Sequence, residues 1–335
     1  MIPVPETHVN APDFSADLAV VLPFHNEGEN VDALMNRLLP VLGSLGLNWH
    51  ILAVDDGSRD DTFARLQEWR AREPRLRLIR LARNFGKDTA LTCGLHHADA
   101  HGVVLMDSDL QHPPEVIPQM VAQWKAGARM VHAVRRNRDT DPWLRRVMTW
   151  GYYRLFHRLA EIDLPEGSGD FRLLDHVVVD ALNHMPERGR FMKGLMSWTG
   201  FPQASVPFDV EHRHAGQSSW NMNQLIRFGF DGLAAFSVAP LRWSALVGFA
   251  VSLAALLYLV VVIVETLVRG IDVPGYASLM VAVLFLGGVQ LTALGILGEY
   301  VGRIFIEVKR RPLYLVSERH GTPQAPSYIS DRRNG

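Results

Sequence analysis

Short apolar runs alternate with amphipathic stretches along the first 240 residues of the chain. The apolar runs predict buried strands. They are Leu18–Leu22, Trp49–Val54, Leu76–Leu81, Gly102–Met106 and Met130–Val134. Helical patterns lie between several of them, as in Asn30–Leu45 and Thr62–Ala71. Strands that alternate with helices predict an α/β fold with a mostly parallel sheet.

A different pattern begins near Trp243. The runs Ser244–Val264 and Gly275–Gly298 contain no charged residue. Each run reaches the roughly 20 residues that span a bilayer core. The alternative is a pair of buried core helices in a soluble protein, but two such long uncharged runs in tandem are rare in soluble folds. The connector between them is short. This pattern predicts a hairpin of two transmembrane helices whose flanks lie on the same side of the membrane.

Basic residues set the expected orientation of the hairpin. Those on its two flanks are Arg227, Arg242, Arg303, Lys309, Arg310 and Arg311. The connector carries only Arg269. The positive-inside rule therefore predicts a multi-pass protein of the inner (plasma) membrane with its N-terminal domain in the cytoplasm. Just before the hairpin, Asn223–Phe236 mixes apolar and charged residues and predicts an amphipathic helix in the membrane interface, with a core helix as the alternative.

The predicted boundaries follow from these patterns. They are a disordered leader over 1–17, an α/β domain over 18–222, the interfacial helix over 223–242, transmembrane helices over 243–270 and 275–300, and a cytosolic C-terminal segment over 301–335. The tail after Ser317 is polar and is predicted to be disordered. The first 17 residues lack an apolar run, so no signal peptide is predicted.

Composition narrows the class of partner. The chain has 34 Lys and Arg against 35 Asp and Glu, for a net charge of −1. A protein that binds nucleic acid normally has a basic excess, so no nucleic-acid partner is expected. The single cysteine, Cys93, excludes an intramolecular disulfide and fits a reducing compartment.

Polar clusters follow three of the predicted strands. In chain order they contain Pro23, His25, Asn26 and Glu27, then Asp55, Asp56, Gly57 and Ser58, then Asp107, Ser108, Asp109 and Gln111. Ligands of parallel sheets bind beyond the carboxyl ends of the strands, so these clusters are predicted to share one site. So much negative charge in one crevice requires a cation or a donor-rich ligand.

The third cluster offers ligands for a metal ion. Asp107 and Asp109 are spaced i, i+2, so in extended backbone their carboxylates share a face, and Gln111 continues the alternation. Such oxygen ligands suit Mg²⁺ or Mn²⁺, which would bind a diphosphate jointly with the protein. The alternative is that Asp107 and Asp109 are solvated residues of a turn. Asp55 is a candidate acceptor for a base N–H, while Asp56 or Ser58 could instead cap the next helix. No glycine-rich dinucleotide fingerprint follows the first strand and no P-loop is present, which disfavours a dehydrogenase.

A set of short motifs carries a family resemblance. VLPFHNE, VDDGSRDDT, RNFGKDTAL, DSDLQHPPE, GSGDFRLLD and RHAGQSSW resemble, in order and spacing, the motifs of family-2 glycosyltransferases of the GT-A fold. The branch that the chain resembles most is that of polyprenyl-phosphate glycosyltransferases, which includes bactoprenol glucosyltransferases, aminoarabinose-lipid synthases and dolichol-phosphate mannose synthases. The resemblance runs from about Leu18 to Val316, hairpin included.

The resemblance implies roles for individual residues. Nucleotide-sugar contacts are expected from Pro23, His25, Glu27, Asp55, Asp56, Lys87, Asp107, Ser108 and Arg135. The metal and diphosphate motif matches Asp107, Asp109 and Gln111. Asp170, near the reacting sugar carbon, and Asp109 are the catalytic candidates. Contacts to the acceptor phosphate are expected from Arg172, Arg213 and Ser218. The alternatives are a solvated Lys87 and surface ion pairs for Arg172 and Arg213. The chain departs from many relatives at His25, where they carry Tyr, and at Ser219, where several carry Lys.

The implied reaction is an inverting transfer of a sugar from a nucleotide diphosphate to polyprenyl (undecaprenyl) monophosphate at the cytoplasmic membrane face. Glucose and UDP are favoured, with aminoarabinose, N-acetylated sugars, mannose and GDP left open. The acceptor phosphate has a second pKa of roughly 6, so it needs little deprotonation and Asp170 could position rather than act as a base. Relatives imply a homo-oligomer, with a tetramer packed through Gly302–Val316 as one form.

Two other functions compete with this hypothesis. A processive polysaccharide synthase would carry a Gln-x-x-Arg-Trp motif and more membrane spans, and the sequence has neither. A membrane-tethered binding protein without activity would not need Asp107, Asp109 and Asp170.

Overall fold

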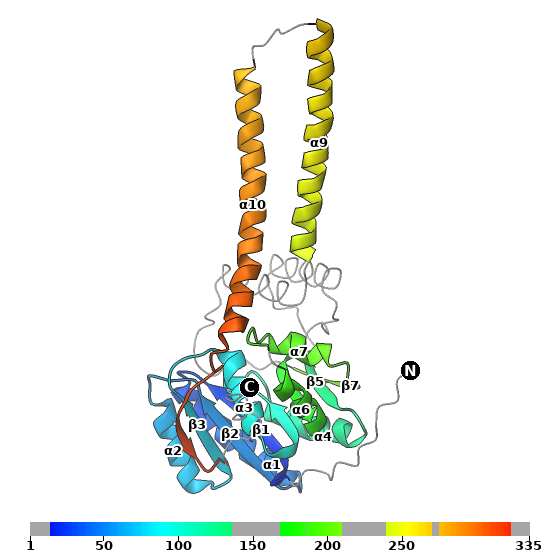
Figure 1. The fold of residues 1–335 in the computed structure, drawn as a ribbon. Coiled ribbons are helices and arrows are strands. Elements are labelled where there is room, and N and C mark those ends of the chain that lie inside the picture. Colours follow the sequence, from blue (N-terminus) through cyan, green and yellow to red (C-terminus); the bar gives the residue numbers. More distant parts are fainter. Residues whose placement is uncertain (1–13, 136–167, 186, 210–238, 270–274, 323–335) are drawn as a thin grey trace. The chain divides into compact units, whose positions relative to one another are not determined.

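The computed structural model describes residues 14–135, 168–185, 187–209, 239–269 and 275–322 (Figure 1). The chain forms two compact units. The first comprises residues 1–148, 164–219 and 312–335, and the second comprises residues 149–163 and 220–311. The predicted interfacial helix, up to residue 238, lies outside the described residues.

The first unit contains an eight-stranded sheet with the order β7-β5-β6-β4-β1-β2-β3-β8. Its central strands are β1 (Ala16–Phe24), β2 (Trp49–Asp55), β3 (Leu76–Leu81), β4 (Ala100–Leu105) and β5 (Met130–Arg135). β1 pairs in parallel with both β2 and β4, and β2 pairs in parallel with β3. β1 and β2 are almost entirely buried, as expected for parallel strands that are covered on both faces. The predicted α/β fold with a mostly parallel sheet is confirmed.

Helices of this unit alternate with the strands. They are α1 (Gly28–Ser44), α2 (Thr62–Arg72), α3 (Lys87–His97), the 3₁₀ turn η1 (Pro114–Val116), α4 (Ile117–Lys125), α6 (His176–His184) and α7 (Met192–Trp198). The apolar face of α1, with Leu34 and Leu38, packs on the core formed by Val20, Leu22 and Ile51. Both predicted helices of this region are present, within two residues of the expected ends.

Three strands were not predicted from the pattern. They are β6 (Ser168–Asp175), β7 (Gln203–Phe208) and β8 (Val316–His320). β6 is antiparallel to both β4 and β5, and β8 is antiparallel to β3. The prediction of disorder after Ser317 is therefore wrong for residues 318–320, because backbone pairing with β3 orders a polar segment. β1 begins at Ala16, inside the stretch predicted to be a leader.

The second unit contains two long helices, α9 (Ala239–Arg269) and α10 (Tyr276–Lys309), which contact each other. Within the described part of the chain, Leu241–Glu265 and Phe285–Lys309 are long and apolar enough to cross a membrane, with mean hydropathies of 2.8 and 1.3. Large apolar side chains such as Phe249, Leu267 and Leu291 are exposed. The predicted helical hairpin is present, and α10 continues past the expected end at residue 300.

Candidate active site

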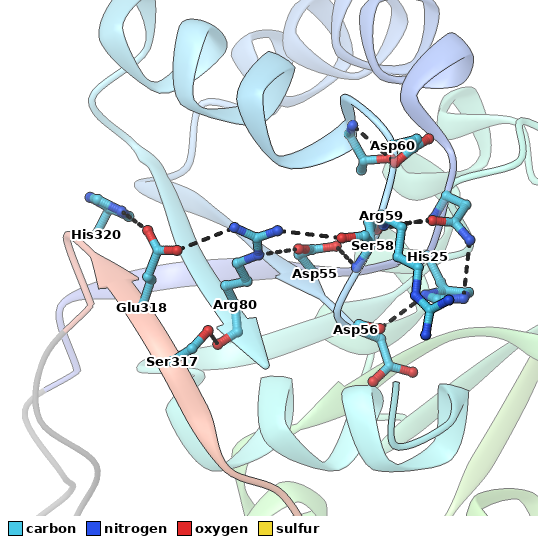
Figure 2. Close-up of polar contacts among 12 residues, drawn as sticks. His25, Asp55, Asp56, Ser58, Arg59, Asp60, Arg80, Ser317, Glu318 and His320 are labelled. Carbon is cyan, nitrogen blue, oxygen red and sulfur yellow. Dashed lines mark hydrogen bonds and ion pairs between the residues drawn. The ribbon is translucent and has the colours of Figure 1, made fainter. Parts of the chain in front are cut away.

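The turn that follows β2 holds its two aspartates in different ways (Figure 2). The Asp55 side chain is fully buried, and its Oδ1 accepts a hydrogen bond of 3.1 Å from the Ser58 amide. Its Oδ2 lies 3.2 Å from Nε of Arg80. Burial raises the pKa of Asp55, and the hydrogen bonds from Ser58 and the charge of Arg80 oppose that rise. Gly57 has φ of 65°, and a side chain there would collide with the backbone of Arg83.

Asp56 organises the loop that leads into α3. Its carboxylate accepts hydrogen bonds from the amides of Phe85 at 2.7 Å and Gly86 at 2.9 Å. Its carbonyl lies 2.9 Å from Nδ1 of His25. The suggestion that Asp56 or Ser58 caps the next helix is wrong, because Asp60 accepts from the first amide of α2, at Thr62. Asp56 thereby fixes the backbone just before Lys87.

The cluster after β1 is tied to the same turn. The amide of Asn26, which has φ of 55°, donates to Oγ of Ser58 at 3.0 Å. The carboxylate of Glu27 accepts from the Asn30 side chain at 2.5 Å. Pro23 is buried and its carbonyl accepts from Oγ of Ser108 at 2.9 Å. The three polar clusters therefore meet at one edge of the sheet, as the sequence predicts.

Lys87, the first residue of α3, bridges two carboxylates at this edge. Its Nζ lies 2.6 Å from Oδ1 of Asp107 and 2.5 Å from Oδ2 of Asp170. Asp107 follows β4, and Asp170 lies near the start of β6. These strands are antiparallel neighbours in which Leu105 pairs with Arg172, so the two carboxylates are brought together. Lys87 is thus held by ion pairs, and the alternative that it is merely solvated is wrong.

Charge at this centre keeps Asp170 ionised. Burial alone would raise the pKa of Asp170, but the ammonium groups of Lys87 and Lys193 outweigh burial and hold that pKa well below its usual range. Lys193, from α7, lies 3.6 Å from Oδ1 of Asp170. The same surroundings act on Asp88, where burial and the neighbouring Asp170 raise the pKa to about 7. Asp170, in contrast, has its pKa held so low that its carboxylate is a weak base.

The segment from Asp107 to Gln111 is bent and does not continue β4. The strand ends at Leu105, and Leu110 has φ of 61°. The expected extended alternation of Asp107, Asp109 and Gln111 is therefore wrong. Oδ1 of the buried Asp109 accepts a 3.1 Å hydrogen bond from the Gln111 amide. Within the described ranges, no three His, Cys, Asp or Glu side chains are grouped so that they alone could hold a metal ion.

The predicted basic residues lie in different surroundings. Arg172 is fully buried, its Nε donates to the Gly169 carbonyl at 3.0 Å, and its Nη1 lies 3.3 Å from Sδ of Met196. A surface ion pair for Arg172 is thus ruled out. Arg135 is exposed at the end of β5. Arg213 and Ser218 lie outside the described residues.

Several residues of the site were missed by reasoning from the sequence. Arg80, Asp88, His112 and Lys193 all lie within it or directly behind it. His112 stacks on Phe171 and accepts from the Asp107 amide at 3.3 Å. Burial lowers the pKa of His112, which favours the neutral ring that this hydrogen bond needs. Arg80 had a signal in the sequence, since it is a charge within the apolar strand LRLIRL.

Comparison with known proteins agrees with this fold. The family model for glycosyl transferase family 2 matches residues 19–182, and the model for the GtrB C-terminal hairpin matches residues 239–304. An uncharacterised glycosyltransferase of Synechocystis is 44% identical over 92% of this chain and 98% of its own. The SfII prophage-derived bactoprenol glucosyl transferase of Shigella flexneri is 39% identical over 91% of this chain and 99% of its own.

The first unit thus has the GT-A-like α/β fold of a glycosyltransferase. The chain belongs to glycosyltransferase family 2 and is a glycosyltransferase. Among solved structures, glucosyl-3-phosphoglycerate synthase from Mycobacterium tuberculosis is similar with a TM-score of 0.43 and 17% identity, over 66% of this chain and 78% of that one.

Proposed function

We propose that the protein transfers a sugar from a nucleotide diphosphate to a polyprenyl monophosphate at the cytoplasmic face of a membrane that α9 and α10 span. The observation that carries this proposal is the bridge from Lys87 to Asp107 and Asp170 beyond the end of β4. The family resemblance implies that this cation and these two carboxylates would lie beside the diphosphate and the reacting sugar carbon, which supports the proposal. Relatives with the name bactoprenol glucosyl transferase support a lipid-phosphate acceptor and favour glucose as the sugar.

The donor would bind along the edge formed by the three polar clusters. Asp55 would accept from the nucleobase, which suits a base with a ring N–H such as uracil. The diphosphate would lie near Lys87, with Arg135 at the outer side of the site. An ionised carboxylate accepts but cannot donate, so uracil and guanine, which both carry a ring N–H, would suit Asp55. UDP is the carrier that the family resemblance favours.

The oxygen chemistry of the site fits a divalent ion. Mg²⁺ and Mn²⁺ use one or two protein carboxylates together with substrate phosphates, so a complete cage of protein ligands is not required. Asp107, Asp109 and the side chain of Gln111 would hold the ion. When bound, it would stabilise the charge that develops on the leaving diphosphate.

Asp170 would orient the sugar and would not act as a general base. Its carboxylate is held by Lys87 and Lys193, which keeps it ionised and reduces its strength as a base. The acceptor phosphate needs no strong base because its second pKa is roughly 6. Asp170 would therefore orient the sugar while the phosphate oxygen attacks from the face opposite the diphosphate, with inversion of configuration.

Radiolabelled sugar transfer to organic-extractable lipid tests the proposal. Membranes that contain the protein would be given polyprenyl phosphate and a panel of UDP- and GDP-sugars, with Mn²⁺ or with EDTA. The expected result is a labelled lipid from a UDP-hexose that EDTA abolishes. No labelled lipid from any of these donors would refute the proposed reaction, while a product that persists in EDTA would refute only the metal.

A further inference from the structure

The C-terminal strand β8 is separated by β3 alone from β2, the strand that ends at Asp55. It follows the second apolar helix in the sequence and pairs with the outer edge of β3, with Arg80 opposite Glu318. Two further contacts fix it there: the Ala82 amide donates to the Leu315 carbonyl at 2.8 Å, and Oγ of Ser317 donates to the Arg80 carbonyl at 3.1 Å. β8 therefore contacts Arg80 of β3, in the α/β core of the first unit.

The guanidinium of Arg80 is shared between β8 and the Asp55 turn (Figure 2). Its Nε lies 3.2 Å from Oδ2 of Asp55, and its Nη2 donates to the Ser58 carbonyl at 3.3 Å. On the other side, Nη1 donates to Oε1 of Glu318 at 3.2 Å. The ring of Phe63 lies under the guanidinium at 4.6 Å. Each edge of this planar cation is thus assigned to a different partner.

This arrangement matters because Asp55 has no access to solvent in the structure, so a nucleobase could reach its carboxylate only by displacing a neighbouring group such as Arg80. A buried carboxylate needs a fixed cation to stay ionised, and Arg80 is the cation that contacts it. If Glu318 were neutral, Arg80 would be drawn more closely to Asp55 and would compete with a nucleobase N–H for the same oxygen. The second carboxylate therefore holds Arg80 at its present distance.

We propose that Glu318, on the strand after the second apolar helix, is a positioning residue for the donor nucleotide and acts through Arg80 on Asp55 and the Ser58 carbonyl. The inference rests on the proposed function, in which Asp55 binds the base. It assigns a role in donor recognition to a segment outside the family-2 match at residues 19–182. Donor binding would thereby require the end of the chain as well as the α/β core.

Calorimetric titration of the full-length protein in detergent with Mn²⁺ tests this role, with UDP and inorganic pyrophosphate as separate ligands. Glu318→Gln is expected to weaken the binding of UDP about threefold, which is the size of effect expected from a partly exposed ion pair. The affinity for pyrophosphate is expected to stay unchanged. In the transfer assay the same variant is expected to raise KM for the UDP-sugar and leave kcat unchanged. Glu318→Asp is expected to recover part of the loss, because it keeps the charge.

Matched variants separate positioning from folding. Arg319→Gln alters the next residue of β8, whose side chain points to the opposite face of the strand, and is expected to bind UDP as the wild type does. Arg80→Gln is expected to weaken the binding of UDP about tenfold, because the substitution leaves the buried carboxylate of Asp55 without its cation.

The outcomes are distinct. Equal UDP affinity in Glu318→Gln and wild type, or equal weakening of UDP and pyrophosphate, would overturn the role of Glu318 alone. A wild type that binds pyrophosphate but no nucleoside diphosphate would overturn the proposed donor and this inference with it.

Discussion

Replacing Lys87 with methionine removes the cation that joins Asp107 to Asp170 and keeps the length of the side chain. Loss of one partner of an ion pair lowers the free energy of unfolding by about 3–5 kcal/mol when the pair is fully buried and by at most ~1 kcal/mol when it is exposed. The carboxylates of Asp107 and Asp170 are 22% and 16% exposed, but Lys87 is 44% exposed. Solvent screening at the lysine therefore places the expected cost near 2 kcal/mol, a value between the two limits.

Two measurements read out this cost. Thermal unfolding of the purified variant is expected to shift down by roughly 4–8 °C, at 2–4 °C per kcal/mol for a domain of this size. The value of kcat/KM for sugar transfer is expected to fall about 30-fold, because in the proposed site the donor diphosphate would lose a charge-assisted contact of similar energy. Lys125→Met, at an exposed lysine that ends α4, is the matched control and is expected to match the wild type.

The pH dependence of Lys87→Met gives a sharper test. Lys87 and Lys193 depress the pKa of Asp170, so in the wild type the ionised form is lost only in strong acid. Without Lys87, burial is opposed less strongly and the pKa of Asp170 rises. The ratio of variant to wild-type activity is therefore expected to fall as the pH is lowered from 8 to 5. A variant whose activity is within twofold of the wild type at every pH would show that Lys87 neither contacts the donor nor controls the ionisation of Asp170.

Two further predictions concern carboxylates of the same site. Asp170→Asn is expected to lower kcat by only about tenfold, since the residue is proposed to orient the sugar; near-complete loss of kcat with unchanged donor affinity in calorimetry would instead make it a general base. Asp88 has its pKa raised to about 7, so the folded protein binds more protons than the unfolded chain between about pH 4 and pH 7, and stability falls as pH rises through that range. Asp88→Asn is expected to unfold about 3 °C above the wild type at pH 8 and at the same temperature near pH 4, and a constant difference would contradict the assignment.

The strands that could be predicted from the sequence are those whose environment is uniform. β1 and β2 are buried on both faces and read as continuous apolar runs. β6 was missed because the buried Arg172 interrupts its apolar residues, and one of the partners of Arg172, Met196, comes from the separate helix α7. β8 was missed because most of its side chains are polar and exposed, so its order comes from backbone pairing that leaves no hydrophobic pattern.

The same distinction holds for the site. Polar clusters at strand ends could be placed at one edge because the topology of a parallel sheet requires it. The bridge from Asp107 to Asp170 through Lys87 could not be foreseen, since it depends on β6 entering the sheet antiparallel beside β4. The bend at Leu110 depends on local hydrogen bonds such as that from the Gln111 amide to Asp109, which an i, i+2 spacing does not encode.

The central claim is that the acceptor is a phosphate that is already a nucleophile, so that a weakly basic Asp170 is sufficient. Transfer to polyprenyl phosphate and to the matching polyprenol, at equal concentrations in the same detergent and with the same UDP-hexose, tests it most directly. Labelled product is expected from the phosphate and none from the alcohol. Comparable labelling of the alcohol, or product from the alcohol alone, would contradict it.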